Sequence, residues 1–301
     1  MATLYTQQSK NIRKTWLLVG VFLSIVLGLG YFLSVYYNNP SILVIAFVFS
    51  LGMNIASFWF SDKIALASAR AVPADEKEYL ELHRIVENLS ITAGLPKPRV
   101  YIIPDMAPNA FATGRNKEHA AVAVTTGLLQ ILDRSELEGV IAHELAHIGN
   151  RDILLQSMVV VLVGFISLLS NIFLRSLAWG GGDSDNRKGS NVLAIVGVVL
   201  LILSPIIAQL IQLAISRKRE FLADASGALL TRYPEGLASA LRKIHNAGMP
   251  MQNASDATAH LYISNPFGGA LNGLHKLFMT HPPVEERISA LLGLSAQVGK
   301  K

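Results

Sequence analysis

The sequence predicts a mainly α-helical integral membrane protein with four transmembrane helices and one α+β domain that is split into two segments. Of its 301 residues, 51% are hydrophobic and only 16% are charged, whereas soluble domains carry about a quarter charged residues. Four long stretches lack any Asp, Glu, Lys or Arg. The remaining segments are long enough to build one ordinary domain with its own core. We therefore expect neither a wholly soluble protein nor a disordered chain.

The first two predicted spans lie near the N-terminus. Residues 15–61 contain no charged side chain, and the turn-forming sequence Tyr37–Pro40 divides them. Each half can cross a hydrocarbon core of about 30 Å, because a helix of about 20 residues suffices. We place these spans at Trp16–Tyr36 and Ser41–Phe60. The first apolar run is too long for a cleaved signal peptide, so we expect it to remain as an anchor.

Two further uncharged stretches predict a membrane hairpin. They cover Ile153–Leu174 and Asn191–Ser216, and Pro205 in the second predicts a kink. A hairpin returns the chain to the face from which it entered, so the segments on either side of it can form one domain. The alternative of buried core helices in a soluble protein is disfavoured, since too little protein remains to cover four of them.

The predicted spans divide the chain into four parts. They are the N-terminal tail with two spans (1–61), the first half of the split domain (62–152), the hairpin with an extracytoplasmic loop (153–216), and the second half of the domain (217–301).

Basic residues beside the spans predict the orientation, because cytoplasmic flanks carry an excess of Lys and Arg. The flanks of the tail and of both domain halves hold Lys10, Arg13, Lys14, Lys63, Arg70, Arg217, Lys218 and Arg219. The loop of the hairpin holds Arg175, Arg187 and Lys188 with Asp183 and Asp185, which weakens the signal without reversing it. We therefore expect the split domain and both termini to be cytoplasmic.

Hydrophobic patterns predict the elements of the split domain. Helices are expected over Asp75–Ala93, Lys218–Leu230 and Pro283–Leu294, strands over Arg99–Ile103 and His119–Thr125, and a loop or edge strand over Pro108–Gly114. The sequence Ser135–Glu138 fits a capping box that opens another helix, and that helix can continue into the third span.

The amino-acid composition also excludes several kinds of site. The chain has no cysteine, so it has no disulfide, no thiolate metal ligand and no cysteine nucleophile. The net charge of +5 is mild, and no basic stripe with interleaved aromatic residues is present. We therefore expect a lipid bilayer as a partner and no nucleic acid.

The helix after Ser135 carries the sequence His143-Glu144-Leu145-Ala146-His147. Positions i and i+4 of a helix share one face, so both imidazoles can bind one metal ion, as zinc sites require. Glu144 reaches the water that such a metal activates and can act as general base. The alternative is a pair of surface histidines beside a solvated glutamate.

A catalytic zinc site has three protein ligands as a rule, and the third is open to question here. The metzincin extension is excluded, because the chain has Asn150 and Ile153 where that pattern needs Gly and His. Glu220, just after the fourth span, is the better candidate. Asp224 shares its helix face at i+4 and could accept a hydrogen bond from a ligating histidine. Alternatively, Glu220 only neutralises the basic residues Arg217–Arg219.

Taken together, these motifs, Pro108–Gly114, and Thr280–Pro283 with Arg287 resemble the HtpX family of bacterial membrane zinc proteases. That family is related to the type I CaaX prenyl proteases and to the gluzincin group. The resemblance covers nearly the whole chain. It implies a gluzincin-type domain in which Glu220 is the third ligand and Glu144 is catalytic. It further implies that His281 and Asn109 lie in the cleft near the substrate and the developing oxyanion. For Arg287, a structural ion pair is as good an explanation as a functional role.

The expected function is that of a zinc-dependent membrane endopeptidase with one Zn²⁺ per chain. Protein substrates, above all the cytoplasmic loops of membrane proteins, are plausible because the motif lies close to the third span. The resemblance implies quality control of misfolded or damaged membrane proteins in the bacterial inner membrane, in cooperation with other proteases. Two alternatives stay open: a prenyl-protein protease, and a non-catalytic membrane scaffold that keeps a structural metal. The intact Glu144 disfavours the scaffold, since a structural site needs no base.

Overall fold

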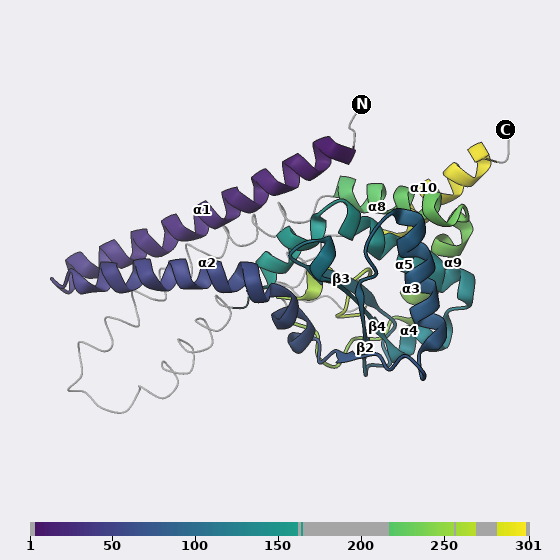
Figure 1. The fold of residues 1–301 in the computed structure, drawn as a ribbon, viewed down its shortest axis with the longest axis horizontal. Coiled ribbons are helices and arrows are strands. Elements are labelled where there is room, and N and C mark those ends of the chain that lie inside the picture. Colours follow the sequence, from purple (N-terminus) through teal and green to yellow (C-terminus); the bar gives the residue numbers. More distant parts are fainter. Residues whose placement is uncertain (1–3, 162–163, 165–216, 256, 269–281, 299–301) are drawn as a thin grey trace.

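The computed structural model describes residues 4–161, 164, 217–255, 257–268 and 282–298. Figure 1 shows two parts: a pair of long helices, and a compact domain from which this pair projects. The pair consists of α1 (Leu4–Tyr36) and α2 (Ser41–Ser68), which pack against each other near the turn that joins them and diverge toward the domain (Figure 1). The turn between them lies at the far end from the domain, so the N-terminal end of α1 lies on the domain side.

The helices α1 and α2 contain the first two predicted spans. Residues Asn11–Tyr36 and Ser41–Ser68 are long and apolar enough to cross a membrane. Many of their large apolar side chains face outward, with Trp16 70%, Ile45 66% and Val48 63% exposed. Gly30 permits the close approach of the two helices, because a Cβ there would collide with the Cβ of Ala46. Apolar surface of this kind is what a helix pair in lipid presents.

The third predicted span begins inside the domain. A short apolar helix, Asp152–Val161, follows the motif, and Ile153, Leu155 and Val160 in it are all buried in protein. The described part of the stretch Ile153–Leu174 therefore contributes to the domain core. The rest of that stretch, the hairpin loop and the fourth predicted span lie outside the described residues.

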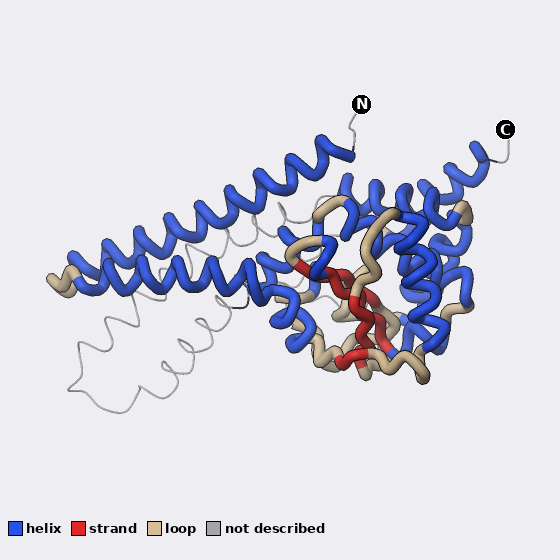
Figure 2. The backbone as a smooth tube through the Cα atoms, viewed as in Figure 1, coloured by secondary structure: helices blue, strands red, loops and turns tan. Residues whose placement is uncertain are grey.

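A four-stranded mixed sheet with the order β1-β2-β4-β3 forms the centre of the domain, drawn as red tube in Figure 2. Its strands are β1 (Val72–Pro73), β2 (Arg99–Ile103), β3 (Ala110–Gly114) and β4 (Ala120–Thr125). β2 and β4 are parallel, and β3 pairs with β4 in antiparallel register. The prediction for β2 is confirmed, and β4 starts one residue later than predicted. Within the predicted segment Pro108–Gly114, residues Ala110–Gly114 form an edge strand.

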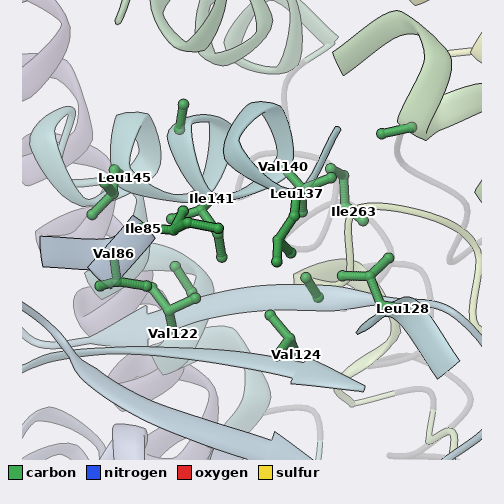
Figure 3. Close-up of a cluster of buried hydrophobic side chains, with 14 of the residues drawn as sticks. Ile85, Val86, Val122, Val124, Leu128, Leu137, Val140, Ile141, Leu145 and Ile263 are labelled. Atoms are coloured by element: carbon green, nitrogen blue, oxygen red, sulfur yellow. The ribbon is translucent and has the colours of Figure 1, made fainter. Parts of the chain in front are cut away.

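Both faces of β4 are buried, which explains why this strand is apolar up to its last residue, Thr125. Val122 and Val124 point toward α5 (Arg134–Gly149), as Figure 3 shows, and pack against Val140 and Ile141 in one core cluster. Alternate residues of the sheet, including Ala121, Ala123 and Phe111, belong to a second cluster on the other face, which contains Ala65 and Leu66 of α2. The second membrane helix thus continues past residue 61 and forms part of the domain core.

Besides the short helix Asp152–Val161, six further helices belong to the described part of the domain. They are α3 (Leu80–Ala93), α4 (Thr126–Ile131), α5 (Arg134–Gly149), α8 (Arg217–Thr231), α9 (Pro234–Ala247) and α10 (Val284–Val298), with 3₁₀ turns at Lys117–His119 and Ala259–Leu261. The predicted start of α3 at Asp75 is wrong by five residues. The Asp75 carboxylate instead accepts hydrogen bonds from the backbone N–H groups of Lys77 and Glu78 in a turn before the helix.

Both ends of α5 differ from the prediction. The capping box is formed by Asp133 and Glu136, two residues before the predicted pair, and the Ser135 hydroxyl donates to Asp133. At the other end, Arg151 has φ 58°, so the helix does not continue into the next one. This left-handed residue redirects the chain after Asn150 and brings Asp152 back toward the histidines.

Candidate metal centre

Three potential metal ligands converge from two helices. His143 and His147 lie one turn apart on α5, and Glu220 lies in the first turn of α8. One ligand atom from each of the three lies within 4.8 Å of the others. The two Nε2 atoms are 3.2 Å apart, and the Glu220 oxygens lie 3.8 Å from Nε2 of His143 and 3.6 Å from Nε2 of His147. All three side chains are buried, at 1–5% exposed.

A glycine allows α8 to lie directly against α5. Gly227 follows Glu220 and Asp224 on one face of α8, at helical spacing of four and three residues. A Cβ at Gly227 would come within 3.0 Å of the backbone nitrogen of His143. This close contact gives the two carboxylates on the same face access to the histidines.

Each histidine is held by a carboxylate at its second nitrogen. Nδ1 of His143 lies 2.9 Å from Asp224, and Nδ1 of His147 lies 3.0 Å from Asp152. A carboxylate at Nδ1 fixes the tautomer in which Nε2 carries a lone pair for a metal. The sequence pattern singled out Asp224 for this contact but not Asp152. The position five residues after the second histidine could have indicated it only if the break at Arg151 had been foreseen.

Arg287 of α10 is fully buried and holds Asp224. Its Nε and one terminal nitrogen donate to the two Asp224 oxygens at 2.8 and 2.7 Å, and its other terminal nitrogen donates to the backbone carbonyl of Ile263 at 3.0 Å. It also lies 3.9 Å from Glu220. The pKa of Arg287 is raised, because the attraction of Asp224 and Glu220 outweighs its burial. Arg287 therefore belongs to the site as the partner of a carboxylate.

The electrostatics of the two histidines differ. Burial lowers the pKa of His143 despite the opposing hydrogen bond to Asp224. Burial acts in the same direction on His147, but the hydrogen bond to Asp152 and the charge of Glu220 outweigh it and raise the pKa of His147 to about 9. For Asp224, burial is outweighed by Arg287, which lowers the pKa of the carboxyl to about 2.

Glu144 is buried beside the edge strand β3. It is 1% exposed, and its helix α5 packs against β3. Burial raises the pKa of Glu144 to about 7, with Glu220 acting in the same direction and His147 and Arg287 against it. The carboxyl therefore lies between the metal-ligand helix and the edge of the sheet.

Of the two residues predicted to lie near the oxyanion, only Asn109 is among the described residues. The Asn109 side chain is 2% exposed, and it donates to the Ser264 carbonyl at 3.0 Å and accepts from the Ser264 backbone N–H at 3.3 Å. It therefore links the start of β3 to the segment around Ser264. His281 lies outside the described residues, so its predicted place in the cleft stays a prediction.

The residues fit a divalent cation such as zinc. Two imidazole nitrogens and one carboxylate are a donor set that catalytic zinc sites use. The surroundings contain four buried carboxyl groups, Glu144, Glu220, Asp152 and Asp224, against two buried guanidinium groups, Arg219 and Arg287. A divalent cation among these groups would balance the excess of negative charge.

A helix-borne histidine pair with a glutamate between them, joined by a carboxylate from a second helix, is the centre of a metallopeptidase. Comparison with known proteins agrees, since the model of "Peptidase family M48" matches residues 76–295. "Protease HtpX homolog" of Thermoanaerobacter pseudethanolicus is 51% identical over 298 residues, covering 97% of this chain and 98% of the relative. The protein of the same name from Pyrococcus furiosus is 49% identical, covering 95% of this chain and 96% of the relative.

The chain therefore belongs to peptidase family M48 and, within it, to the HtpX family, which confirms the resemblance found in its motifs. It is a membrane metalloprotease. Its fold is similar to that in the crystal structure of S. mikatae Ste24p, with a TM-score of 0.50 and 19% identity over 97% of this chain and 67% of that one.

Proposed function

We propose that one zinc ion per chain is held by His143, His147 and Glu220, and that Glu144 acts as general base in the hydrolysis of peptide bonds. The observation that carries this proposal is the convergence of the three ligand atoms within 4.8 Å, with Glu144 on the same helix between the histidines. Asp224 and Asp152 orient the two imidazoles through Nδ1.

Zinc bound there would supply a Lewis acid that polarises the scissile carbonyl and activates a water molecule. The Glu144 carboxylate accepts a proton from the attacking water and returns it to the nitrogen of the departing amine. Backbone hydrogen bonding by Ala112 lowers the pKa of this carboxyl and so opposes the effect of its burial. The low exposure of the surrounding side chains keeps bulk water out of the site.

The remaining residues of the family pattern have supporting roles in this proposal. His281 and Asn109 contribute to substrate binding and to the stabilisation of the oxyanion, a role that rests on the family resemblance. Arg287 keeps Asp224 charged and in place, as its two hydrogen bonds to that carboxylate support.

The substrates we propose are misfolded or damaged membrane proteins, cleaved in cooperation with other quality-control proteases of a bacterial inner membrane. The proposal includes four spans, a domain split between residues 62–152 and 217–301, and a cytoplasmic active site. Two observations support an active site close to the bilayer. Large apolar side chains of α1 and α2 are exposed, as in helices that contact lipid, and the end of α2 packs into the domain core.

Incubation of the purified full-length protein with an unfolded polypeptide tests the activity. We expect cleavage that a chelator abolishes and added zinc restores. A prenylated peptide that is cleaved in preference to the unfolded polypeptide would favour the prenyl-protein protease instead. Bound zinc without cleavage of either substrate would favour the scaffold.

Single cysteines test the orientation, because the chain has none of its own. We would introduce them at Ser184, in the hairpin loop outside the described residues, and at Glu76, an exposed position of the domain. A membrane-impermeant thiol reagent added to intact cells should label only the cysteine at 184. Labelling at 76 alone would invert the orientation, and labelling at both would contradict the hairpin.

A further inference from the structure

The N-terminal end of α1 reaches the metal centre through one side chain. Asn11 is 3% exposed, although its neighbours Ile12 and Arg13 are exposed. It lies five residues before Trp16, where the first predicted span begins. The amide nitrogen of Asn11 donates to Asp152 Oδ1 at 2.6 Å and to the Asn150 carbonyl at 3.1 Å. An apolar contact alone would not require a buried amide at this position.

Asp152 divides its two oxygens between Asn11 and His147. Oδ2 lies 3.0 Å from Nδ1 of His147, while Oδ1 accepts from Asn11 at 2.6 Å and lies 3.4 Å from Arg219. Arg219 also donates to the Asn11 side-chain oxygen at 3.3 Å, so the three residues form a connected polar network. The carboxylate plane of Asp152 is thereby fixed from the side opposite His147.

The carboxylate beside each histidine is therefore held by a residue from a different part of the chain. Asp224 at His143 is held by Arg287 of α10, within the domain. Asp152 at His147 is held by Asn11, which belongs to the helix that enters the membrane. The second arrangement connects the membrane anchor to a metal ligand.

We propose that Asn11 is a positioning residue for the metal centre. This inference rests on the proposed function, in which His147 is a ligand. Asn11 holds Asp152 in the orientation in which Oδ2 accepts the Nδ1–H of His147, leaving the lone pair of Nε2 for the metal. Without the Asn11 amide, the Asp152 carboxylate can rotate toward Arg219, and the imidazole loses its orientation. Loss of such an outer partner typically lowers metal affinity 10- to 100-fold.

Thr15 provides a matched control. It lies one turn further along α1, is 6% exposed, and its hydroxyl donates to the Asn11 backbone carbonyl at 3.0 Å. Thr15→Val and Asn11→Leu both replace a buried polar side chain on the same helix face by an apolar one of similar size. If Asn11 only helps α1 to pack, the two variants should behave alike.

The experiment measures zinc affinity of the full-length protein in detergent by competition with a chromogenic chelator, and the absorption spectrum of the Co²⁺-loaded form. We expect Asn11→Leu to bind zinc 10- to 100-fold more weakly and to alter the cobalt spectrum. Thr15→Val should match wild type in both, and the thermal midpoints of the two metal-free variants should be similar. Wild-type zinc affinity in Asn11→Leu, or equal losses in both variants, would overturn the proposal.

If Asn11→Leu does not accumulate in the membrane, Asn11→Gln and Asn11→Ala replace it. Only Gln keeps an amide N–H that can reach Asp152, so Gln should retain zinc more tightly than Ala, and equal affinities would contradict the proposal. A His147→Ala variant tests the proposed ligand set separately from the role of Asn11. Unchanged zinc affinity in His147→Ala refutes the proposed ligand set itself, whereas a loss there with none in Asn11→Leu refutes only the role of Asn11.

Discussion

Gly227 of α8 lies against the backbone of His143 in α5, so close that a methyl group there would force the two backbones apart by a few tenths of an ångström. A Cβ at Gly227 would lie 3.0 Å from the His143 nitrogen and 3.2 Å from the carbonyl carbon of Ala142. Both neighbours are backbone atoms in a buried helix, so neither can move aside without moving the metal-binding residues. The distance between the two ligand-bearing helices therefore depends on the absence of a side chain at residue 227, which is a glycine.

Gly227→Ala should push α8 away from α5 and weaken zinc binding. Overpacking of this kind costs about 1–3 kcal/mol, despite the higher helix propensity of alanine. Gly293→Ala in α10 is the matched control, because nothing lies within 4 Å of its added methyl group. That control should be neutral or more stable by about 0.5–1 kcal/mol. Thermal unfolding and zinc competition measure both effects, and equal behaviour of the two variants would refute the close-contact explanation.

Glu144→Gln should keep zinc bound and lose cleavage. The substitution removes the proton acceptor but none of the three ligands, and loss of a general base typically costs about 10²- to 10⁴-fold in rate. Elemental analysis and hydrolysis of an unfolded polypeptide measure the two properties in one preparation. Glu138→Gln, at the surface of the same helix, is the control and should retain activity. Near wild-type cleavage by Glu144→Gln would rule out the proposed mechanism.

Glu220→Ala should lower both zinc content and activity. The Glu220 carboxylate is the third member of the ligand cluster, and its loss leaves two imidazoles to hold the ion. Glu286→Ala, on the exposed side of α10, removes a carboxylate without touching the site and should leave zinc at one per chain. Full zinc content in Glu220→Ala would move the third ligand elsewhere, with Asp224 the next residue to test.

Arg287→Met should destabilise the domain strongly, because it leaves the buried Asp224 carboxylate without its charge partner. Removing one member of a buried pair costs about 3–5 kcal/mol. Arg134→Met is the control, since its ion pairs with Glu81 and Glu138 are at the surface, where a pair contributes about 0–1 kcal/mol. The thermal unfolding midpoints of Arg287→Met and Arg134→Met, each measured against wild type, give the two losses of stability. A similar small decrease in both would contradict a buried structural role for Arg287.

The N-cap of α5 offers a pH-dependent prediction. The Glu136 backbone N–H and the Ser135 hydroxyl donate to Asp133 and lower the pKa of its carboxyl. A lowered folded-state pKa means that this stabilisation is present above the unfolded pKa of about 3.9 and is lost as the pH falls through the folded value. Asp133→Ala should therefore cost about 1 kcal/mol near neutral pH, and less in acid. Asp133→Asn retains a cap and should lose little at pH 7. A stability difference between wild type and Asp133→Ala that stays constant down to pH 2 would contradict this.

The local elements were largely predictable from sequence, because their signals are local. The strand Arg99–Ile103 and the histidine pair on a helix follow from short-range patterns, and both are present in the structure. The capping box was predicted at Ser135, yet Asp133 forms it. Two overlapping capping patterns occur there, and only the position of α5 on the sheet decides between them.

The support around the ligands could be predicted only in part. Asp224 shares a helix face with Glu220, so its position followed from helical spacing. Asp152 and Asn11 did not follow, because their contacts depend on the left-handed turn at Arg151 and on the docking of α1 across the domain. Such long-range contacts leave no periodic pattern in the sequence.

The length of α2 determines how far the sheet can lie from the hydrocarbon core of a bilayer. Its 28 residues extend about 42 Å, which exceeds a hydrocarbon core of about 30 Å by about 12 Å. The excess is the end that carries Ala65 and Leu66 into the back of the sheet. In a bilayer that α2 spans, this continuous helix would act as a stiff rod rather than a flexible linker, and it would hold the sheet at a constant height above the lipid surface. A peptide segment tethered near that height meets the site at high effective concentration, whereas a freely diffusing protein does not. We therefore expect the anchor to sort substrates by their height above the bilayer before any side chain of the substrate is recognised.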